Sequence, residues 1–579
     1  MKFWKQFSVF LLFVFSALYI THPLIFHLGD YVTSFGDELF IAWNHNWIIH
    51  SFFTNPLNIF NANIYFPYKN TLAFSEPFIT SGVLSIIPVW LVKQPIAAVN
   101  FILISSIVLT GFAVYLLCLK ITKNHLASFA SAFLLIFSPA FLDKKTHLQV
   151  MALEYIPLSI LFTLIYLKKE KFIYLIFSAL FFLFQIYNSF MPGYFLVFFY
   201  SIFLSVLFFS KKVEFAKLIN KKSLILVLTT IILTIPLITP YFKVSKEFNG
   251  KRDIRDAIHF ALQPEDFFVA NEHSRFNKLL TIVQNPTSYP KNAEIKPGFI
   301  GGIFSFLFIA SLIKFPYYLK KKNIFYITFF IVSILGLILS LGPALHFNRQ
   351  TIHFPFLIPL PYGLFYYLLP GFQGFRNSAR FEMLFILMST IPIAVFLSDW
   401  FKYLKNKKYL FFGLLMLGII LEFPGPIKFF PIAQTKDFPF EHKFLATTPV
   451  DSVYLEMPIY NWNMFPYSGE ELRREYFSTI HFRKSVNGYS GFSPYPWQDM
   501  TYRLAQTFPD EKSIREIKKI GVSYLVIHKN EYDAISKKGF ELFKYKFPNG
   551  QTVRKKLLEN KALELVKTNE NVDIFKFSN

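Results

Sequence analysis

The chain is poor in cysteine and in acidic residues, and both shortages exclude classes of protein. Its one cysteine, Cys118, lies inside an apolar run. A single thiol excludes an intrachain disulfide and a cluster of thiolate metal ligands. The 36 acidic residues stand against 59 Lys and Arg, which leaves a net charge of +23. The lysines lie in short loops between apolar runs, as membrane topology signals do, so we expect no nucleic-acid partner.

Apolar and aromatic residues are abundant instead. Hydrophobic residues make up 53% of the chain, 76 residues are Phe, and the mean hydropathy is positive. An apolar run of about 20 residues can cross a bilayer as a helix. The sequence therefore predicts a polytopic α-helical membrane protein with about 11 transmembrane helices. The expected helices are 6–26, 97–119, 126–141, 150–167, 172–190, 193–209, 223–241, 298–313, 324–341, 381–400 and 409–421.

The lysines also orient these helices. If the N-terminus is cytoplasmic in the cell (inner) membrane, every short cytoplasmic loop is basic, as the positive-inside rule requires. These loops contain Lys120 and Lys123; Lys168, Lys169 and Lys171; Lys211, Lys212, Lys217, Lys221 and Lys222; Lys314, Lys320, Lys321 and Lys322; and Lys402, Lys405, Lys407 and Lys408. The first outer loop is then 27–96. Its short apolar run 79–92 contains Pro88, so we expect an interfacial or re-entrant piece there.

After about residue 430 the membrane pattern ends. The segments 452–459 (SVYLEMPI) and 522–528 (VSYLVIH) are typical of buried strands, and 511–521 (EKSIREIKKIG) predicts an amphipathic helix that ends at a glycine. Roughly 150 residues are enough for one small domain. We therefore expect a membrane module at 1–425, followed by an extracytoplasmic soluble α/β domain at 430–579.

Two adjacent acids stand out in the first outer loop. From Asp37 onward, apolar residues recur with helical spacing, so Asp37 is expected near the start of a helix that Gly36 precedes. Glu38 follows it directly. Both acids would lie at the outer membrane face, where a carboxylate beside an apolar wall can serve as a general base.

A second outer loop carries Asp143, His147 and Glu154. His147 and Glu154 are seven residues apart and would share one face of a continuous helix. Glu154 falls within an apolar run, where an ionised carboxylate is costly unless it is paired or hydrated. These three residues are candidates for metal or acceptor binding. Structural roles also remain open, with Asp143 at a solvated helix end and His147 as a cap.

Two arginines in a later outer loop are candidates for phosphate binding. Arg376 and Arg380 have the i, i+4 spacing that stacks side chains on a helix, and two guanidiniums bind oxyanions well. They could instead be membrane anchors or partners of Glu382. Arg252, Arg255 and His259 lie in a mixed-charge segment and could contact lipid headgroups, but we expect an ordinary charged surface there.

The order of these parts resembles the bacterial integral-membrane glycosyltransferases of the C-type superfamily (GT-C). These include protein O-mannosyltransferases, aminoarabinose transferases and oligosaccharyltransferases. The resemblance lies in SFGDELFIAWNHNW and NIYFPYKNTLAF after the first helix, then SPAFLDKKTHLQVMALEYIPL, PGFQGFRNSARF, NGYSGFSP and IKKIGVSYLVIH. It extends over both the membrane part and the terminal domain.

The resemblance implies transfer of a sugar from a polyprenyl-phosphate carrier on the extracytoplasmic side, with an essential acid in the first loop. That acid corresponds to Asp37 and, less directly, to Glu38. A divalent metal (Mg or Mn) would correspond to Asp143, His147 and Glu154, although no two acids there are one residue apart. The WWD signature of oligosaccharyltransferases is absent from the sequence.

The residues suit this chemistry independently of the resemblance. Displacement of a lipid phosphate from an anomeric carbon needs a base for the acceptor hydroxyl and cations for the leaving phosphate. The acceptor could be a glycan, a lipid or a protein. Two other classes remain open, a lipid or polysaccharide transporter and a non-catalytic membrane scaffold for the outer domain. A transporter would place ionisable residues in mid-span and show internal repeats, which this sequence does not show.

The predicted orientation can be tested with accessibility tags. Tags at Lys169, Lys212, Lys321 and Lys407 should be cytoplasmic, because those loops hold the clustered lysines, and a tag at the C-terminus should be extracytoplasmic. A cytoplasmic C-terminus would contradict both the helix count and the side assigned to the acids.

Overall fold

The computed structural model describes residues 2–578 apart from 270–297, 349, 354–356, 424, 462–463, 465–467 and 544–546. Part of the outer segment expected after residue 242 therefore lies outside the described residues. The chain forms two compact units. The helical unit comprises Met1–Phe26, Ile102–Leu237 and Lys251–Lys428, and the mixed unit comprises His27–Phe101, Ile238–Gly250 and Phe429–Asn579.

Each of the eleven ranges predicted to span the membrane holds a helix. The helices are α1 (Lys2–Ile20), α5 (Ala97–Thr122), α6 (His125–Ile136), α9 (Tyr155–Lys169), α10 (Ile173–Asn188), α11 (Phe190–Phe209), α13 (Lys221–Phe248), α16 (Gly302–Ile313), α18 (Ile324–Ser340), α20 (Glu382–Leu404) and α21 (Lys408–Glu422). Shorter helices join them: α7 (Pro139–Leu142), α8 (Leu148–Met151), α12 (Val213–Leu218), α14 (Ile254–His259), α17 (Phe315–Lys320) and α19 (Pro361–Leu368).

Fewer of these helices are long and apolar enough to cross a membrane. Five described stretches qualify: Ala97–Thr122, Leu148–Lys169, Phe190–Phe209, Lys221–Phe248 and Ser378–Glu422. The bent pair His125–Ile136 and Pro139–Thr146 makes a sixth if it is one span. Four apolar helices of 10–17 residues are shorter than the test requires. The protein is thus a multi-pass membrane protein, but the count of 11 spans is not confirmed.

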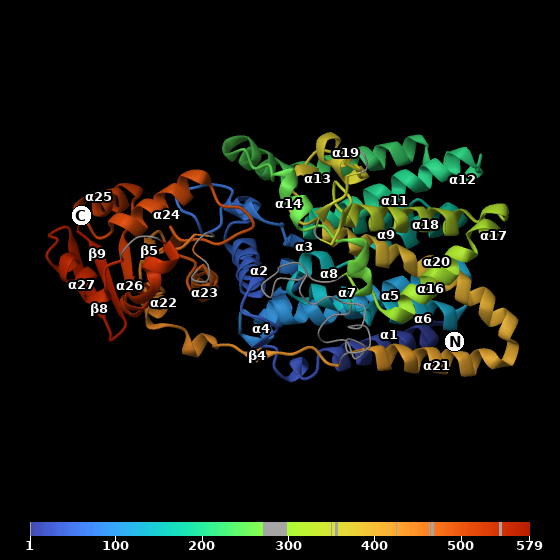
Figure 1. Cartoon of the computed structure of the whole chain (residues 1–579), viewed down its shortest axis with the longest axis horizontal. Helices are drawn as coiled ribbons and strands as arrows, with labels where there is room; N and C mark the ends of the chain where they lie inside the picture. The colour runs from blue at the N-terminus through green and yellow to red at the C-terminus, as the bar shows by residue number, and fades with distance from the viewer. Residues whose placement is uncertain are drawn as a thin grey trace. The chain divides into compact units, whose positions relative to one another are not determined.

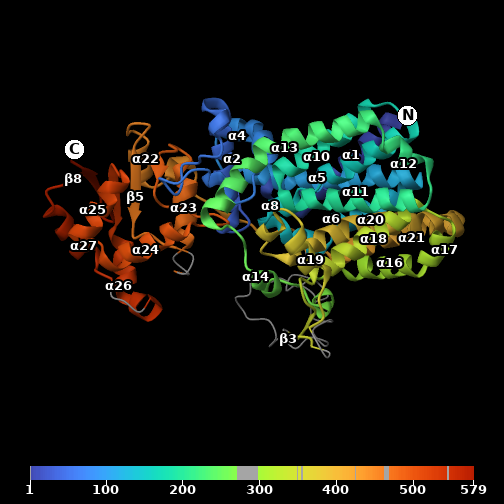
Figure 2. The ribbon, with the colours of Figure 1, turned by 90° about the horizontal axis from the view of Figure 1, so that it is seen from above.

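Close backbone contact organises the helical unit around α20. Residues Glu382 to Ser398 of this helix are all buried. An added Cβ on Gly336 of α18 would lie 2.6 Å from the backbone nitrogen of Phe385, so only glycine allows α18 to pack this closely. The Ser131 hydroxyl of α6 donates to the Thr390 carbonyl on another side of α20. Figure 2 shows α5, α11, α18 and α20 running along the same direction.

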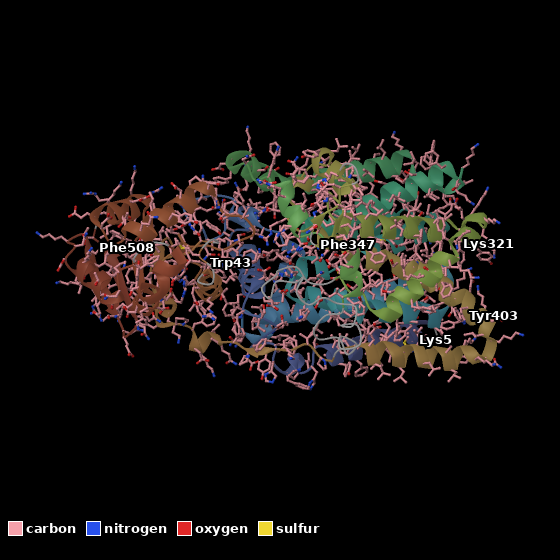
Figure 3. All side chains as sticks on the ribbon, viewed as in Figure 1. Lys5, Trp43, Lys321, Phe347, Tyr403 and Phe508 are labelled. Atoms are coloured by element: carbon pink, nitrogen blue, oxygen red, sulfur yellow. The ribbon has the colours of Figure 1, made fainter. Side chains whose placement is uncertain are left out.

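The lysine-rich connections gather at one end of these helices. Figure 3 labels Lys5, Lys321 and Tyr403 at the same end of the helical unit, with Phe347 toward the other end. The short helices α12 and α17, which lie in two basic loops, are at the end marked by Lys5 and Lys321 (Figure 2). A shared end is what the positive-inside assignment of these loops requires.

The mixed unit is built on a five-stranded sheet with the order β6-β5-β7-β9-β8. The strands are β5 (Val453–Met457), β6 (Lys484–Ser485), β7 (Tyr524–His528), β8 (Leu563–Thr568) and β9 (Val572–Phe577). Strands β6, β5 and β7 are parallel, whereas β9 is antiparallel to both β7 and β8. Helices α22 (Phe440–Leu445), α23 (Gly469–Ser478), α24 (Tyr495–Thr507), α25 (Glu511–Ile520), α26 (Lys529–Phe543) and α27 (Gly550–Leu558) belong to the same part of the unit (Figure 1).

The local predictions for this part are confirmed. Both predicted strands form at the core of the sheet, as β5 and β7, and every residue in them is buried. The predicted amphipathic helix forms as α25, with Asp510 as its N-cap. It ends at Gly521, whose φ of 99° lies in the left-handed region where glycine carries no steric penalty.

The first outer loop belongs to the same compact unit as this sheet. Its helix α2 (Asp37–Thr54) is largely buried and contacts α23, and Trp43 donates from Nε1 to Asn63 Oδ1 at 3.0 Å. The backbone nitrogens of Tyr65 and Phe66 donate to the carbonyls of Asn487 and Ser485. The segment expected as a separate domain at 430–579 therefore folds together with the loop expected in the membrane module.

The apolar run 79–92 forms two short helices, α3 (Ile79–Leu84) and α4 (Ile86–Val92), with Ser85 between them. Neither has the length of a transmembrane helix. Ile48 of α2 lies so close to Gly82 that an added Cβ would be 2.8 Å from its side chain. This arrangement agrees with an interfacial or re-entrant piece and not with a single span.

Candidate functional site

The two acids of the first outer loop have different environments at the start of α2. Gly36 is the N-cap residue, and its N–H donates to Ser34 Oγ at 3.2 Å. The same Ser34 hydroxyl donates to Glu38 Oε2 at 2.5 Å, and Glu38 is only 1% exposed. Asp37 is half-buried. Asp37 is thus the more accessible of the two acids, and Glu38 is a buried hydrogen-bond acceptor.

A cavity of about 330 Å³ lies inside the mixed unit. Phe35 and Leu39 line it from the start of α2, one on each side of Asp37 in the sequence. Its other walls come from residues 431–433, Pro439, α22, β5, α23, the end of β7 and the start of α26. The charged and titratable lining consists of Glu441, Glu456, Glu470, Glu531, Arg473, Arg474, His442 and His528.

Glu456 is the buried centre of this lining. His528 Nε2 lies 2.8 Å from Glu456 Oε2, and His442 Nε2 lies 3.5 Å from Glu456 Oε1. Arg474 approaches with Nε 3.6 Å from Glu456 Oε2. Burial alone would raise the pKa of Glu456, but the charges and hydrogen bonds of these three neighbours lower that pKa to about 2.

Arg474 connects this carboxylate to two others. Its Nη1 donates to Glu471 Oε1 at 2.9 Å and its Nη2 donates to Glu531 Oε2 at 2.8 Å. Burial raises the pKa of Glu471 to about 7, although Arg474 opposes that shift. A fully buried arginine thus holds three carboxylates that come from a strand, its own helix and the start of another helix.

Ligand atoms of Glu441, His442 and Glu456 lie within 4.8 Å of one another, close enough to surround a metal ion. The hydrogen bonds of His442 oppose that role. The backbone N–H of Arg483 donates to His481 Nδ1 at 2.9 Å, so a neutral His481 carries its proton on Nε2. That nitrogen is 3.1 Å from His442 Nδ1, which must accept the bond.

The proton of His442 is therefore on Nε2, the nitrogen that faces Glu456. Burial lowers the pKa of both histidines, which keeps them neutral. A metal ion would need the lone pair of His442 Nε2, and that lone pair is absent in this tautomer. The Glu441, His442 and Glu456 group does not fit a metal ion in this hydrogen-bond arrangement.

The expected site in the second outer loop does not come together either. Among the described residues, Asp143, His147 and Glu154 form no converging group of metal ligands. The continuous helix predicted from His147 to Glu154 is wrong, because α8 ends at Met151 and α9 begins at Tyr155. His147 Nδ1 is 2.9 Å from Thr146 Oγ1. Glu154 is buried and accepts from Thr110 Oγ1 at 3.3 Å.

Lys144, next to Asp143, has a clear partner in the helical unit. Its Nζ lies 3.5 Å from Glu382 Oε2, and Glu382 at the start of α20 is fully buried. Loss of the lysine would destabilise the fold strongly, because Glu382 would then be a buried carboxylate without a cation. Glu382 is thus partnered by a lysine of the second outer loop.

The two arginines predicted to stack on one helix do not do so. Arg376 lies in the extended link between the 3₁₀ turns Phe372–Gly374 and Ser378–Phe381, and Arg380 lies in the second turn. The i, i+4 stacking prediction is wrong because no helix covers both positions. The guanidinium of Arg376 lies over the Phe260 ring, 4.7 Å from its centroid.

Arg252 is the neighbour of Arg376 that sequence spacing did not reveal. Its backbone N–H donates to the Gln373 carbonyl at 3.0 Å, and Tyr366 Oη donates to its carbonyl at 2.5 Å. Burial and the charge of Arg376 lower the pKa of Arg252. The only sequence signal was the basic character of its segment, which an ordinary surface would share.

The chain was compared with known proteins. No family model and no curated protein matches it in sequence. Among solved structures, it is similar to the arabinofuranosyltransferase AftD from Mycobacteria, with a TM-score of 0.59 at 11% identity, over 100% of this chain and 40% of that one. It is also similar to the oligosaccharyltransferase AglB from Archaeoglobus fulgidus, with a TM-score of 0.50 at 13% identity, over 94% of this chain and 71% of that one.

The chain has the GT-C fold. Both neighbours are GT-C glycosyltransferases, so the fold that the resemblance implied is confirmed. The chain spans less than half the length of AftD. At these identities the likeness establishes the GT-C fold and leaves the substrates to be argued from the residues.

The Glu456 cluster predicts how the stability of the protein depends on pH. The pKa of Glu456 is about 2 in the folded protein and about 4.5 ordinarily, so its charge stabilises the fold above pH 4.5 and that stabilisation is lost as the pH falls toward 2. Glu456→Gln should flatten this acid limb and destabilise the protein at pH 7 by about 3 kcal/mol, because Arg474 loses a buried partner.

Thermal unfolding of the full chain in detergent between pH 7 and pH 3 measures both effects. Glu511→Gln is the matched control, because Glu511 pairs with Arg515 at 3.5 Å on the surface, and it should leave the curve unchanged. An unchanged acid limb in the Glu456 variant would contradict the assignment.

Proposed function

We propose that the protein is a membrane glycosyltransferase that moves a sugar from a polyprenyl-phosphate carrier to an acceptor on the extracytoplasmic side of the membrane. The observation that carries this proposal is an accessible acid, Asp37, at the start of α2 in a chain with the GT-C fold. The substrate classes printed for the neighbours, dolichol phosphate for one and an arabinofuranosyl group for the other, belong to those proteins and only support the class of chemistry.

Asp37 is the proposed general base. The acceptor hydroxyl oxygen attacks the anomeric carbon while its proton passes to the Asp37 carboxylate, and the bond from that carbon to the phosphate oxygen breaks. Polyprenyl phosphate leaves, and a single displacement inverts the anomeric centre, so no second carboxylate is required as nucleophile. Glu38 supports this role indirectly, because its bond to Ser34 holds the turn that precedes the helix.

Arg376 and Arg252, together with Arg380, are proposed to bind the donor phosphate. Burial and, after it, the charge of Arg376 lower the pKa of Arg252, while Asp256 opposes the shift. An anion bound near both guanidiniums would reduce the repulsion between them. Planar guanidinium groups also bind phosphate oxygens in pairs and stabilise the charge that develops on the leaving group. No step is assigned to a divalent metal, because Asp143, His147 and Glu154 do not form a converging ligand set in the described structure.

Donor binding should depend on these arginines. Arg252→Gln, Arg376→Ala or Arg380→Ala should each weaken binding of a polyprenyl-phosphate sugar by about 1.5 to 3 kcal/mol, the loss of a charge-assisted hydrogen bond. The affinity of each purified variant in nanodiscs for the polyprenyl-phosphate sugar measures this loss. Arg255→Gln is the control, since Arg255 is exposed and pairs with Asp253. Unchanged affinity in all three variants would make these arginines structural.

Transfer should depend on Asp37. Asp37→Asn keeps the size of the side chain and can still interact with the helix start, so the protein should fold and bind donor. It cannot accept the acceptor's proton, and loss of a general base lowers the rate by roughly 100-fold to 10,000-fold. Radiolabelled sugar transfer in membranes measures this loss.

Two variants calibrate that result. Asp30→Asn removes another acid of the same loop, which contacts His27 at 3.2 Å, and should leave transfer intact. Glu38→Gln should lower stability more than turnover, because Glu38 is buried. If the Asp37 variant turns over normally and the Glu38 variant does not, the base is Glu38; if neither matters, the transporter and scaffold alternatives are favoured.

A further inference from the structure

The proposed transfer uses Asp37 and the arginines of the helical unit, and it leaves the charged cavity of the mixed unit without a role. This cavity measures about 330 Å³, which is within the size range of small-molecule sites. We propose that it binds a saccharide that is the acceptor of the transfer. That the saccharide is the acceptor rests on the proposed function. That a saccharide binds in the cavity does not.

Hydrogen-bond donors and acceptors both line the cavity, and this favours a hydroxyl-bearing ligand. The guanidinium of Arg473 is a donor, and the carboxylates of Glu441 and Glu470 are acceptors. A sugar hydroxyl both donates and accepts, so a ligand of this class can meet both kinds of group.

The charges of the wall point the same way. Four carboxylates line the cavity against two guanidiniums, which disfavours a phosphate or carboxylate ligand. Three of the four carboxylates are already paired: Glu456 with His528, Glu470 with Arg473, and Glu531 with Arg474. A metal ion is disfavoured by the proton on His442 Nε2, which the bonds to His481 require. A neutral polyhydroxyl compound is left.

Aromatic side chains supply the apolar part of such a site. Phe35, Tyr476 and Phe477 line the cavity together with the charged groups. Phe477 is held by Phe438, with ring centroids 4.9 Å apart, and by His442 at 5.5 Å. The C–H face of a sugar ring packs on an aromatic ring while its hydroxyls meet the polar wall.

The position of the cavity explains why its ligand would be the acceptor. Phe35 and Leu39 line it, and these residues stand two positions before and two positions after Asp37. A saccharide in the cavity therefore lies beside the turn that carries the proposed base. The proposed acceptor class is then a glycan, and not a protein or a lipid.

The test uses the full chain in nanodiscs and methyl glycosides of glucose, galactose, mannose and rhamnose as probes, with binding followed by saturation-transfer NMR. At least one glycoside should bind. Its affinity should fall at least tenfold in Phe477→Ala and in Arg473→Gln, which alter the half-buried ring and the exposed rim of the cavity. Arg515→Gln is the control, since Arg515 forms a similar exposed pair outside the cavity, and it should bind like the parent.

Inorganic phosphate and Zn²⁺ serve as competing probes. Neither should displace the glycoside, and displacement by either would overturn the assignment in favour of an anion or a metal site. Absence of binding for every glycoside would overturn it as well. Equal affinity in the two cavity variants and the parent would place the saccharide elsewhere and also overturn it.

Sugar transfer measured on the same proteins separates this inference from the proposed function. Arg473→Gln should raise the KM for a glycan acceptor and leave donor affinity unchanged. If transfer proceeds while no glycoside binds the cavity, the inference fails and the glycosyltransferase proposal stands. If the parent binds glycosides in the cavity but transfers no sugar, the proposed function fails and the cavity remains a saccharide site.

Discussion

A carboxylate without access to water sets the architecture of the mixed unit. Glu456 is on the buried strand β5 and stays ionised because His442 from α22, Arg474 from α23 and His528 from β7 approach it together. An unpaired charge at this depth would be strongly destabilising, so the folded state needs all four elements in place. The same cluster forms one wall of the cavity that α2 closes at Phe35 and Leu39. Stability and the candidate binding site therefore depend on one group of residues.

Charge is distributed differently in the helical unit. Glu382 at the start of α20 is buried and meets Lys144 at 3.5 Å, which joins the second outer loop to the helix that the others surround. The close approach of α18 at Gly336 needs no polar contact, because a missing side chain lets backbones touch. A hydrogen bond between two loops, from the Arg252 N–H to the Gln373 carbonyl, brings Arg252 near Arg376.

Accessibility separates residues that look equivalent in the sequence. Asp37 and Glu38 are neighbours of the same charge, yet Glu38 is buried against Ser34 and Asp37 is only half-buried. The direction of hydrogen bonds makes a similar distinction at His442. Its distance to Glu441 and Glu456 suits a metal, but the chain of bonds from Arg483 through His481 leaves its facing nitrogen protonated. Distances alone would have assigned a different ligand to this cavity.

Periodicity and composition determined the helices, the two central strands and the C-cap at Gly521, because these depend on the local alternation of apolar residues and on glycine's freedom at positive φ. The resemblance to GT-C proteins came from the order of several segments along the chain, and no single motif carried it. Three features could be seen only in the tertiary structure. The helix is interrupted between His147 and Glu154, Arg252 lies near Arg376, and the first outer loop folds with the terminal sheet. The cavity around Glu456 could not be predicted from the sequence either, since its residues come from segments up to several hundred positions apart. Such contacts depend on burial and charge pairing between distant segments, so no local sequence pattern predicts them.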